Sequence, residues 1–180
     1  MVLLKDSLNV SLYIRIKKVF MKEAAKKVKQ FAEVKKLVST AKKRGFTVVT
    51  TNGCFDLLHV GHTRYLRYAR TLGDVLVVGV NSDQSVRRNK GAGRPIIPER
   101  ERAELIASLE AVDYVFIFDD TTPHRFLRAL IPAVHVKGGD RKLSDVVERD
   151  IVEEIGTRLV LAPYERNRST TRLVGKIKKK

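Results

Sequence analysis

Short apolar runs alternate with helical segments along most of the chain. The runs are rich in Val, Ile and Leu, as is typical of buried parallel strands. They lie at 46–51, 75–80, 113–118, 133–137 and 158–162. Helical segments are expected between these runs and after the last one, over 62–72, 98–110, 122–131, 145–155 and 169–178. This alternation predicts an α/β fold with a doubly wound parallel sheet of five strands, flanked by helices.

The first 45 residues predict a basic helical extension to a main domain at 46–180. Apolar residues recur at helical spacing over 22–43, and lysines fill most of the other positions. We expect the apolar face to pack on the domain, although a basic amphipathic helix can also lie on a membrane surface. Three interpretations of residues 1–20 are open. They could form an extra element, contact a partner, or be an extension upstream of a translation start at Met21.

The formal net charge of +16 is concentrated at the two ends of the chain. Residues 1–45 hold 13 basic and 3 acidic residues, residues 164–180 hold 7 and 1, and residues 46–163 are neutral with 16 of each. Basic ends attract anions in general, but they carry no RNA-binding motif and almost no interleaved aromatic residues. We therefore do not expect nucleic acid or membrane as the physiological partner.

The expected compartment is the cytoplasm. The single cysteine, Cys54, excludes an internal disulfide and favours a reducing compartment. The sequence contains no apolar run of transmembrane length and no signal-peptide pattern.

Two histidines, three residues apart, follow the first predicted strand. His59 and His62 come after a short Gly-containing loop and stand at the start of the next predicted helix. Side chains at positions i and i+3 share a helix face, and the first helical turn presents unpaired N–H groups and the positive end of the helix dipole. Two imidazoles there can hold a polyphosphate. A metal site is not expected, because no Glu lies between them and no third ligand has a clear spacing.

The second predicted strand leads into a polar segment that contains Asn81, Lys90 and Arg94. We expect Lys90 and Arg94 to lie in a loop with two glycines, Gly91 and Gly93. A mobile loop with cations can close over phosphates. The ordinary interpretation of the polar residues at the strand end is a helix cap.

Three further segments combine cations, glycines and hydroxyls near predicted strand or helix ends. Arg102, within 98–110, could either form ion pairs on the helix surface or take part in the site. The Lys-Gly-Gly-Asp segment at 137–140 is either a turn or a contact to a sugar or phosphate. The hydroxyls at 169–171 can cap the last helix and also cradle phosphate.

The segment 52–62, Asn-Gly-Cys-Phe-Asp-Leu-Leu-His-Val-Gly-His, closely resembles the His-x-Gly-His signature of the nucleotidylyltransferase superfamily. Over 46–177 the motifs resemble, in order and spacing, heptose 1-phosphate adenylyltransferase. That domain forms the C-terminal half of bifunctional ADP-heptose synthase, and this chain resembles a standalone form with any heptose kinase on a separate chain. The resemblance implies a Rossmann-like fold, and it is the only support for a homodimer.

The reaction that the resemblance implies joins ATP and D-glycero-D-manno-heptose 1-phosphate to give ADP-heptose and pyrophosphate. The sugar phosphate attacks the α-phosphate in line, without a covalent enzyme intermediate, and the protein supplies positioning and charge stabilisation. Mg²⁺ is expected to be held mainly by the phosphates and water.

Site residues are implied by the same resemblance. The catalytic residues would be His59, His62 and Lys90. The nucleotide would contact Asn52, Cys54, Phe55, His59, His62, Lys137, Gly139, Asp140, Arg168, Ser169 and Thr170. The acceptor would contact Asp56, Asn81, Lys90, Arg94 and Arg102. Two departures bear on the acceptor, because Arg141 replaces the usual Tyr and Gly156 stands alone where Gly-Gly is usual.

Two alternatives remain open. The chain could be a related transferase, such as a glycerol-3-phosphate cytidylyltransferase or an FAD synthetase. It could also be a non-catalytic binder of nucleic acid or anionic membranes. The presence of both histidines, Lys90 and the hydroxyls at 169–171 opposes the loss of catalysis.

Overall fold

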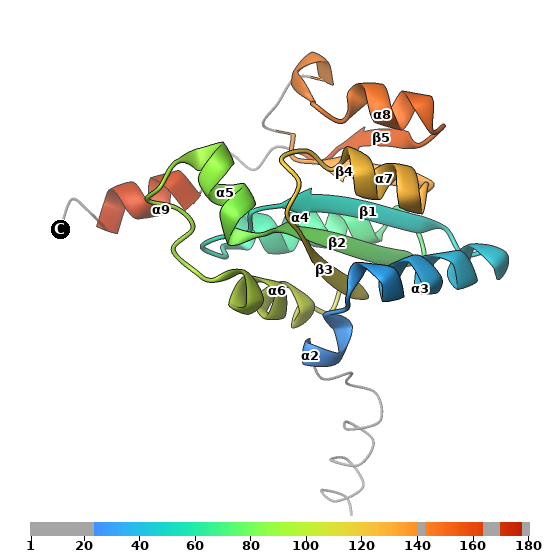
Figure 1. Cartoon of the computed structure of the whole chain (residues 1–180), viewed down its shortest axis with the longest axis horizontal. Coiled ribbons are helices and arrows are strands. Elements are labelled where there is room, and N and C mark those ends of the chain that lie inside the picture. The colour runs from blue at the N-terminus through green and yellow to red at the C-terminus, as the bar shows by residue number, and fades with distance from the viewer. Residues whose placement is uncertain (1–23, 140–142, 164–169, 178–180) are drawn as a thin grey trace, which may run out of the picture.

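Among the described residues, five parallel strands form one sheet in the order β3-β2-β1-β4-β5 (Figure 1). The structure is a computed structural model, and it describes residues 24–139, 143–163 and 170–177. The strands are β1 (Val48–Gly53), β2 (Val75–Asn81), β3 (Tyr114–Phe118), β4 (Val134–Lys137) and β5 (Arg158–Leu161). The predicted α/β fold with a five-stranded, Rossmann-like parallel sheet is therefore confirmed.

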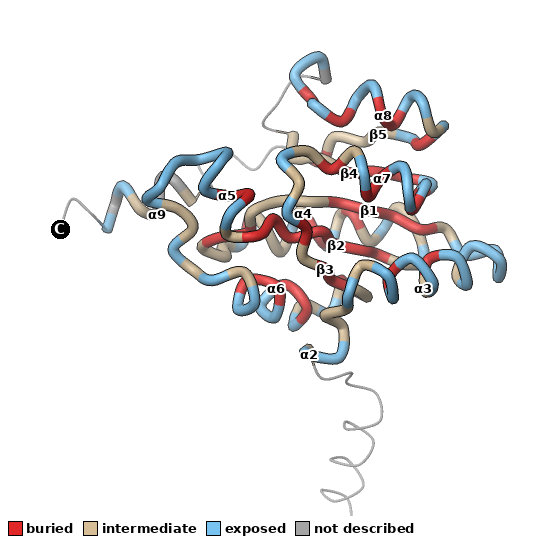
Figure 2. Tube along the Cα trace, in the orientation of Figure 1, coloured by how far each residue is buried: buried red, intermediate tan, exposed pale blue. Residues whose placement is uncertain are grey.

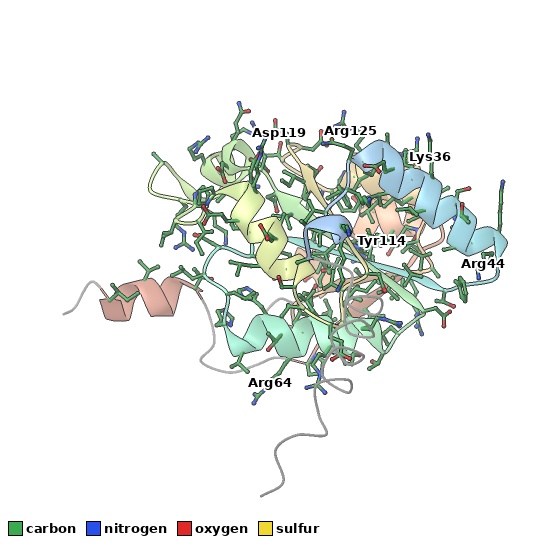
Figure 3. The ribbon with its side chains drawn as sticks, turned by 90° about the horizontal axis from the view of Figure 1, so that it is seen from below. Lys36, Arg44, Arg64, Tyr114, Asp119 and Arg125 are labelled. Carbon is green, nitrogen blue, oxygen red and sulfur yellow. The ribbon has the colours of Figure 1, made fainter. Side chains whose placement is uncertain are left out.

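Helices cover both faces of the sheet (Figure 1). They are α2 (Ala24–Lys27), α3 (Phe31–Lys43), α4 (Val60–Arg70), α5 (Asp83–Lys90), α6 (Glu99–Ala107), α7 (His124–Leu130), α8 (Arg149–Glu154) and α9 (Thr170–Ile177), with a 3₁₀-helix η1 (Leu143–Asp145). Buried side chains of α4 and α6 pack into one apolar cluster with strand residues, and those of α3, α7 and α8 pack into a second. Strands β1 to β4 are accordingly mostly buried, whereas β5 at the other edge of the sheet has no buried residue (Figure 2). By contrast, α9 projects away from the sheet (Figures 1 and 3).

The N-terminal helix packs on the sheet, as its apolar face predicts. Val34 and Val38 of α3 are buried in the second cluster. Lys36 of α3 and Arg44 after it project away from the sheet (Figure 3). No helix among the described residues is long and apolar enough to cross a membrane. The division of the chain at residue 45 stays a prediction.

The prediction of one continuous helix over 22–43 is wrong, because the backbone is extended between α2 and α3. Val28 forms a parallel β-bridge with Val115, and the Lys29 N–H donates to the Val115 carbonyl at 2.8 Å. Strand β3 is the edge of the sheet and leaves backbone groups open for pairing. That pairing replaces one turn of helix, and α3 then begins after its N-cap, Gln30.

The prediction that Lys90 lies in a loop is also wrong, because it is the last residue of α5. Ser82 caps this helix, and its hydroxyl accepts a hydrogen bond from the Ser85 N–H at 2.9 Å. In α5 only Ser85 and Val86 are buried, so the helix carries no apolar periodicity that the sequence could reveal. The prediction that the polar residues after β2 cap a helix is therefore confirmed.

Candidate active site

The crevice between β1 and β4 is the place where this sheet topology puts a ligand. The two strands are parallel neighbours, but α4 follows β1 on one face while α8 follows β4 on the other. In open α/β sheets, ligands bind outside the carboxyl ends of the strands where successive connections diverge in this way. Asn52 lies near the carboxyl end of β1, and Lys137 lies at that of β4.

The two histidines cap α4 through their own ring nitrogens. His59 is the N-cap, and its Nδ1 accepts a hydrogen bond from the Gly61 N–H at 3.1 Å. His62 Nδ1 accepts one from the His59 N–H at 3.3 Å. A ring nitrogen that accepts a hydrogen bond carries no proton, so each neutral imidazole holds its proton on Nε2. The helix start therefore offers two ring N–H donors beside its backbone N–H groups, which suits an anion.

Burial keeps His62 neutral at physiological pH. Desolvation, followed by the repulsion that a protonated His59 and Lys90 would exert, lowers the pKa of His62 to about 4. Lys90 is exposed, yet it lies near enough to His62 to act on its titration. Two of the three residues predicted to be catalytic, His59 and His62, thus contact each other, and the catalytic roles of all three stay predictions.

The loop between β1 and α4 is bent at Phe55, which has a positive φ of 47°. A left-handed backbone is rare for an aromatic residue and is held by surrounding contacts. The ring of Phe55 is buried and meets that of His62 edge-on, with centroids 5.5 Å apart. A Cβ at Gly53 would lie 3.1 Å from the Phe55 ring, so glycine suits this bend. Cys54 and Phe55 therefore lie in the turn beside the histidines.

Arg102 is fully buried, so the interpretation as surface ion pairing is wrong. Its Nε donates to the Ile97 carbonyl at 2.8 Å, and its Nη1 donates to the Cys54 carbonyl. Its Nη2 donates to the Asn81 carbonyl at 2.8 Å and forms an ion pair with the Asp83 carboxylate at 2.7 Å. One guanidinium thereby joins α6 to the ends of β1 and β2 and to the first turn of α5. Its predicted contact with the acceptor stays a prediction.

Asp56 and Arg94, both predicted to contact the acceptor, contact each other. Arg94 Nε lies 3.1 Å from Asp56 Oδ2, and the carboxylate is only 2 % exposed. Asp56 Oδ1 also accepts hydrogen bonds from the N–H groups of Ile96 and Ile97, at 2.9 and 3.0 Å. Asp56 therefore anchors the segment between α5 and α6 against the histidine loop.

Lys137 forms a buried ion pair with Glu148, a residue that sequence reasoning missed. Lys137 Nζ lies 2.6 Å from Glu148 Oε1 and 3.1 Å from Asn52 Oδ1. Glu148 immediately precedes α8 and follows two valines, so no motif or spacing marks it.

The remaining predicted site residues divide into described and undescribed ones. Asn81 is buried, and its Nδ2 donates to Ser85 Oγ at 2.9 Å. Gly139 lies in the turn after β4. Thr170 begins α9, and its hydroxyl donates to the Leu57 carbonyl at 3.3 Å, which ties α9 to the histidine loop. Asp140, Arg168 and Ser169 lie outside the described residues, so their roles stay predictions.

Sequence comparison identifies the family. The family model described as cytidylyltransferase-like matches residues 50–174, which is more than half of the chain and includes the histidine pair. The chain belongs to the cytidylyltransferase-like family. This membership confirms the resemblance seen in the His-x-Gly-His segment and the expectation of a nucleotidyltransferase enzyme.

Relatives of this cytidylyltransferase-like chain include longer proteins. It is 51% identical over 151 residues to the bifunctional protein HldE of Geobacter metallireducens, covering 84% of this chain and 31% of that protein. It is 49% identical over 157 residues to the bifunctional protein HldE of Geobacter sulfurreducens, covering 87% and 32%. The chain thus spans about a third of the length of these relatives.

Solved structures agree on the fold. The lipopolysaccharide core biosynthesis protein from Thermoplasma volcanium matches with a TM-score of 0.58 and 29% identity, over 67% of this chain and 99% of that chain. Pantoate-beta-alanine ligase from Francisella tularensis matches with a TM-score of 0.59. At 15% identity over 78% of this chain and 67% of that chain, the second likeness bears on the fold alone.

Proposed function

We propose that this chain is an adenylyltransferase that makes ADP-heptose and pyrophosphate from ATP and D-glycero-D-manno-heptose 1-phosphate. The observation that carries the proposal is the histidine pair at the start of α4. Both Nδ1 atoms accept backbone hydrogen bonds, so each neutral ring carries its proton on Nε2, the atom that would donate to a phosphate oxygen. The identity of 51% to a bifunctional HldE protein supports the assignment of the substrate.

The transfer needs positioning and charge stabilisation, which these residues can supply. An oxygen of the sugar phosphate attacks the α-phosphorus of ATP and forms a new P–O bond. The bond from the α-phosphorus to the bridging oxygen of the β-phosphate breaks, and that oxygen leaves with pyrophosphate. His59 and His62 would donate hydrogen bonds to the phosphates as charge develops. Lys90 would neutralise the acceptor phosphate or the transition state.

Mg²⁺ fits this site as an ion carried on the phosphates of ATP. Among the described residues, no three His, Cys, Asp or Glu side chains gather where they could share a metal ion. Asp56, the carboxylate nearest the histidines in sequence, already binds Arg94 and two backbone N–H groups. Phosphate oxygens and water are the ligands that Mg²⁺ prefers at such sites, where the bound ion offsets phosphate charge.

Three parts of the proposal concern partners and remaining contacts. The chain spans about a third of the HldE proteins, and a heptose kinase as a partner is proposed from the family resemblance. A homodimer is proposed by the same family resemblance. Asp140, Arg168, Ser169 and Thr170 are proposed to complete the nucleotide site, and Thr170 already contacts the histidine loop.

The test is pyrophosphate release in the presence of Mg²⁺. ATP and CTP are each combined with both anomers of heptose 1-phosphate, glycerol 3-phosphate, FMN or no acceptor. Release with ATP and one heptose 1-phosphate anomer supports the proposal and fixes the anomer. Release only with CTP and glycerol 3-phosphate, or only with ATP and FMN, reassigns the substrate and contradicts it. Folded protein that binds ATP but turns over no pair also contradicts it.

A further inference from the structure

The ion pair between Lys137 and Glu148 lies in the crevice between β1 and β4. The side chains are 15% and 5% exposed, and their charged atoms are 2.6 Å apart. Lys137 also donates to Asn52 Oδ1 at 3.1 Å, so the network reaches across from β4 to β1. Removing two opposite charges from water costs free energy that their mutual attraction often does not offset. Stability alone therefore does not explain this pair. Its place at the ligand crevice suggests a role in the site.

The surroundings of Lys137 are dry enough for an unpaired charge to matter. His135 lies two residues before Lys137 on the same face of β4 and is 0% exposed. Its Nδ1 shares a hydrogen bond with Thr50 Oγ1 at 2.9 Å, and its Nε2 has no hydrogen-bond partner among the described residues. Burial, followed by the charge of Lys137, lowers the pKa of His135 well below its usual value. Because a neutral His135 carries no charge, the charge beside Lys137 that balances its ammonium comes from the carboxylate of Glu148.

The same network fixes the orientation of the Asn52 amide. An ammonium can only donate hydrogen bonds, so the atom of Asn52 that faces Lys137 must be the carbonyl oxygen. The amide nitrogen is then directed away from Lys137, and among the described residues it makes no hydrogen bond. This nitrogen is a neutral donor near the carboxyl end of β1, on the strand that leads to the histidine loop.

We propose that Glu148 is a positioning residue, which holds Lys137 on Asn52 so that the crevice offers a neutral amide donor rather than a free ammonium. The ligand group recognised there is an uncharged hydrogen-bond acceptor, a hydroxyl or ring atom of the nucleoside or of the acceptor sugar. Phosphate recognition is left to the histidine pair and Lys90. This inference rests on the proposed function and assigns to Lys137 a different part from direct phosphate binding.

The test compares Glu148→Gln, Asn52→Ala and the double variant with wild type. Gln keeps the length of Glu and removes its charge. Glu153→Gln is the matched control, because Glu153 pairs with Arg149 on the exposed side of α8, with both side chains at least half exposed. For each protein, kcat and the KM of each substrate are measured at substrate concentrations that span KM, and thermal unfolding is recorded.

We expect Glu148→Gln to raise the KM of one substrate about tenfold while kcat changes less than threefold. The substrate affected, nucleotide or sugar phosphate, identifies the ligand. Asn52→Ala should raise the same KM, and the double variant should be no worse than the more impaired single variant, because one interaction is lost in all three. Glu153→Gln should match wild type.

A lowered unfolding temperature in Glu148→Gln with both KM values unchanged would overturn the inference, since that is the behaviour of a purely structural ion pair. Additive effects of the two substitutions would overturn it as well. If wild type turns over no substrate pair, the proposed function fails by itself, and calorimetric binding of ATP and of the sugar phosphates is compared instead. Unchanged affinity for all of them in both single variants then overturns the inference, and a shared loss for one supports it.

Discussion

The imidazole rings of His59 and His62 are stacked, with centroids 3.9 Å apart and 23° between their planes. The stack is possible because His59 is the N-cap of α4 and His62 lies three residues later, on the same side of the first turn. Two neutral rings tolerate this contact, whereas two imidazolium ions would repel each other. The stacking and the protonation state of the pair therefore depend on each other.

Replacing His62 by Ala should lower kcat by about a hundredfold or more, as expected for the loss of a donor that stabilises transition-state charge. Pyrophosphate release under saturating substrates measures the effect, and circular dichroism checks that the fold persists. His124→Ala is the control, because His124 contacts the Val147 carbonyl outside the histidine loop. A nearly normal rate in His62→Ala would exclude the assigned role.

Stability should decrease as the pH falls from about 6.5 towards 4. Folding lowers the pKa of His62 from 6.5 to about 4, so in this window the unfolded chain binds a proton that the folded chain does not. His135, whose pKa is also lowered by burial, acts in the same direction. The favourable contribution of each ring is complete above its unfolded pKa and is lost as the pH falls through its folded one.

In His62→Gln, the free energy of unfolding that is lost as the pH falls through this window should be about 1–2 kcal/mol smaller than in wild type. This value allows for the partial solvent exposure of the ring. Urea unfolding at a series of pH values between 4 and 7 measures the slope. The remaining slope should come in part from His135. Equal slopes in wild type and His62→Gln would show that the ring titrates normally in the folded protein.

Arg102→Met should destabilise the fold by about 3–5 kcal/mol, because it leaves the carboxylate of Asp83 and the carbonyls of Ile97, Cys54 and Asn81 without their donor. Arg100→Met is the matched control, since Arg100 is exposed on the same helix. Chemical denaturation compares the two variants. A loss below about 1 kcal/mol in Arg102→Met would contradict the inference that this guanidinium holds α6, α5 and the ends of β1 and β2 together.

Gly73→Ala should cost about 1–3 kcal/mol through overpacking. A Cβ at this position would lie 2.7 Å from the Thr47 carbonyl oxygen and 2.7 Å from Val49 Cγ2, where the backbone enters β2 beside β1. Gly93→Ala meets no atom within 4 Å and should leave stability unchanged. Thermal unfolding of both variants tests the difference. Equal midpoints would mean that the backbone and side chains at the start of β1 move to accommodate the Cβ without loss of stability.

The sheet could be predicted because its strands are short, apolar runs that form the buried middle layer of the molecule. The break at Val28 could not, because it depends on a backbone pairing with the edge strand β3, which lies some 90 residues away in sequence and leaves no local signal. Helix α5 was missed for a different reason. It rests on the sheet through few buried side chains, so its capping serine is the only strong sign of its start.

The histidine pair could be predicted from its spacing and from the motif around it, whereas the partners of the other charged groups could not. Arg102 stands among glutamates in the sequence, and its burial follows only from the way α6 packs against the ends of β1 and β2. Glu148 meets Lys137 because the residue before α8 lies beside the end of β4, which no sequence motif expresses. Tertiary contact, and not local pattern, decides which charges are paired.

The bond from Asp56 to the N–H groups of Ile96 and Ile97 also determines where the chain can hinge. It fixes the second half of the segment between α5 and α6, so residues 94–97 must move with the body of the protein. Between α5 and these residues lie Gly91 and Gly93, whose Cβ positions meet no atom within 4 Å, so the backbone can bend there without a side-chain clash. A closure that carries Lys90 onto a ligand would therefore bend the chain at the two glycines while Asp56 holds residues 94–97, and it would break the contacts of Arg88 and Asn89 with the segment after β3.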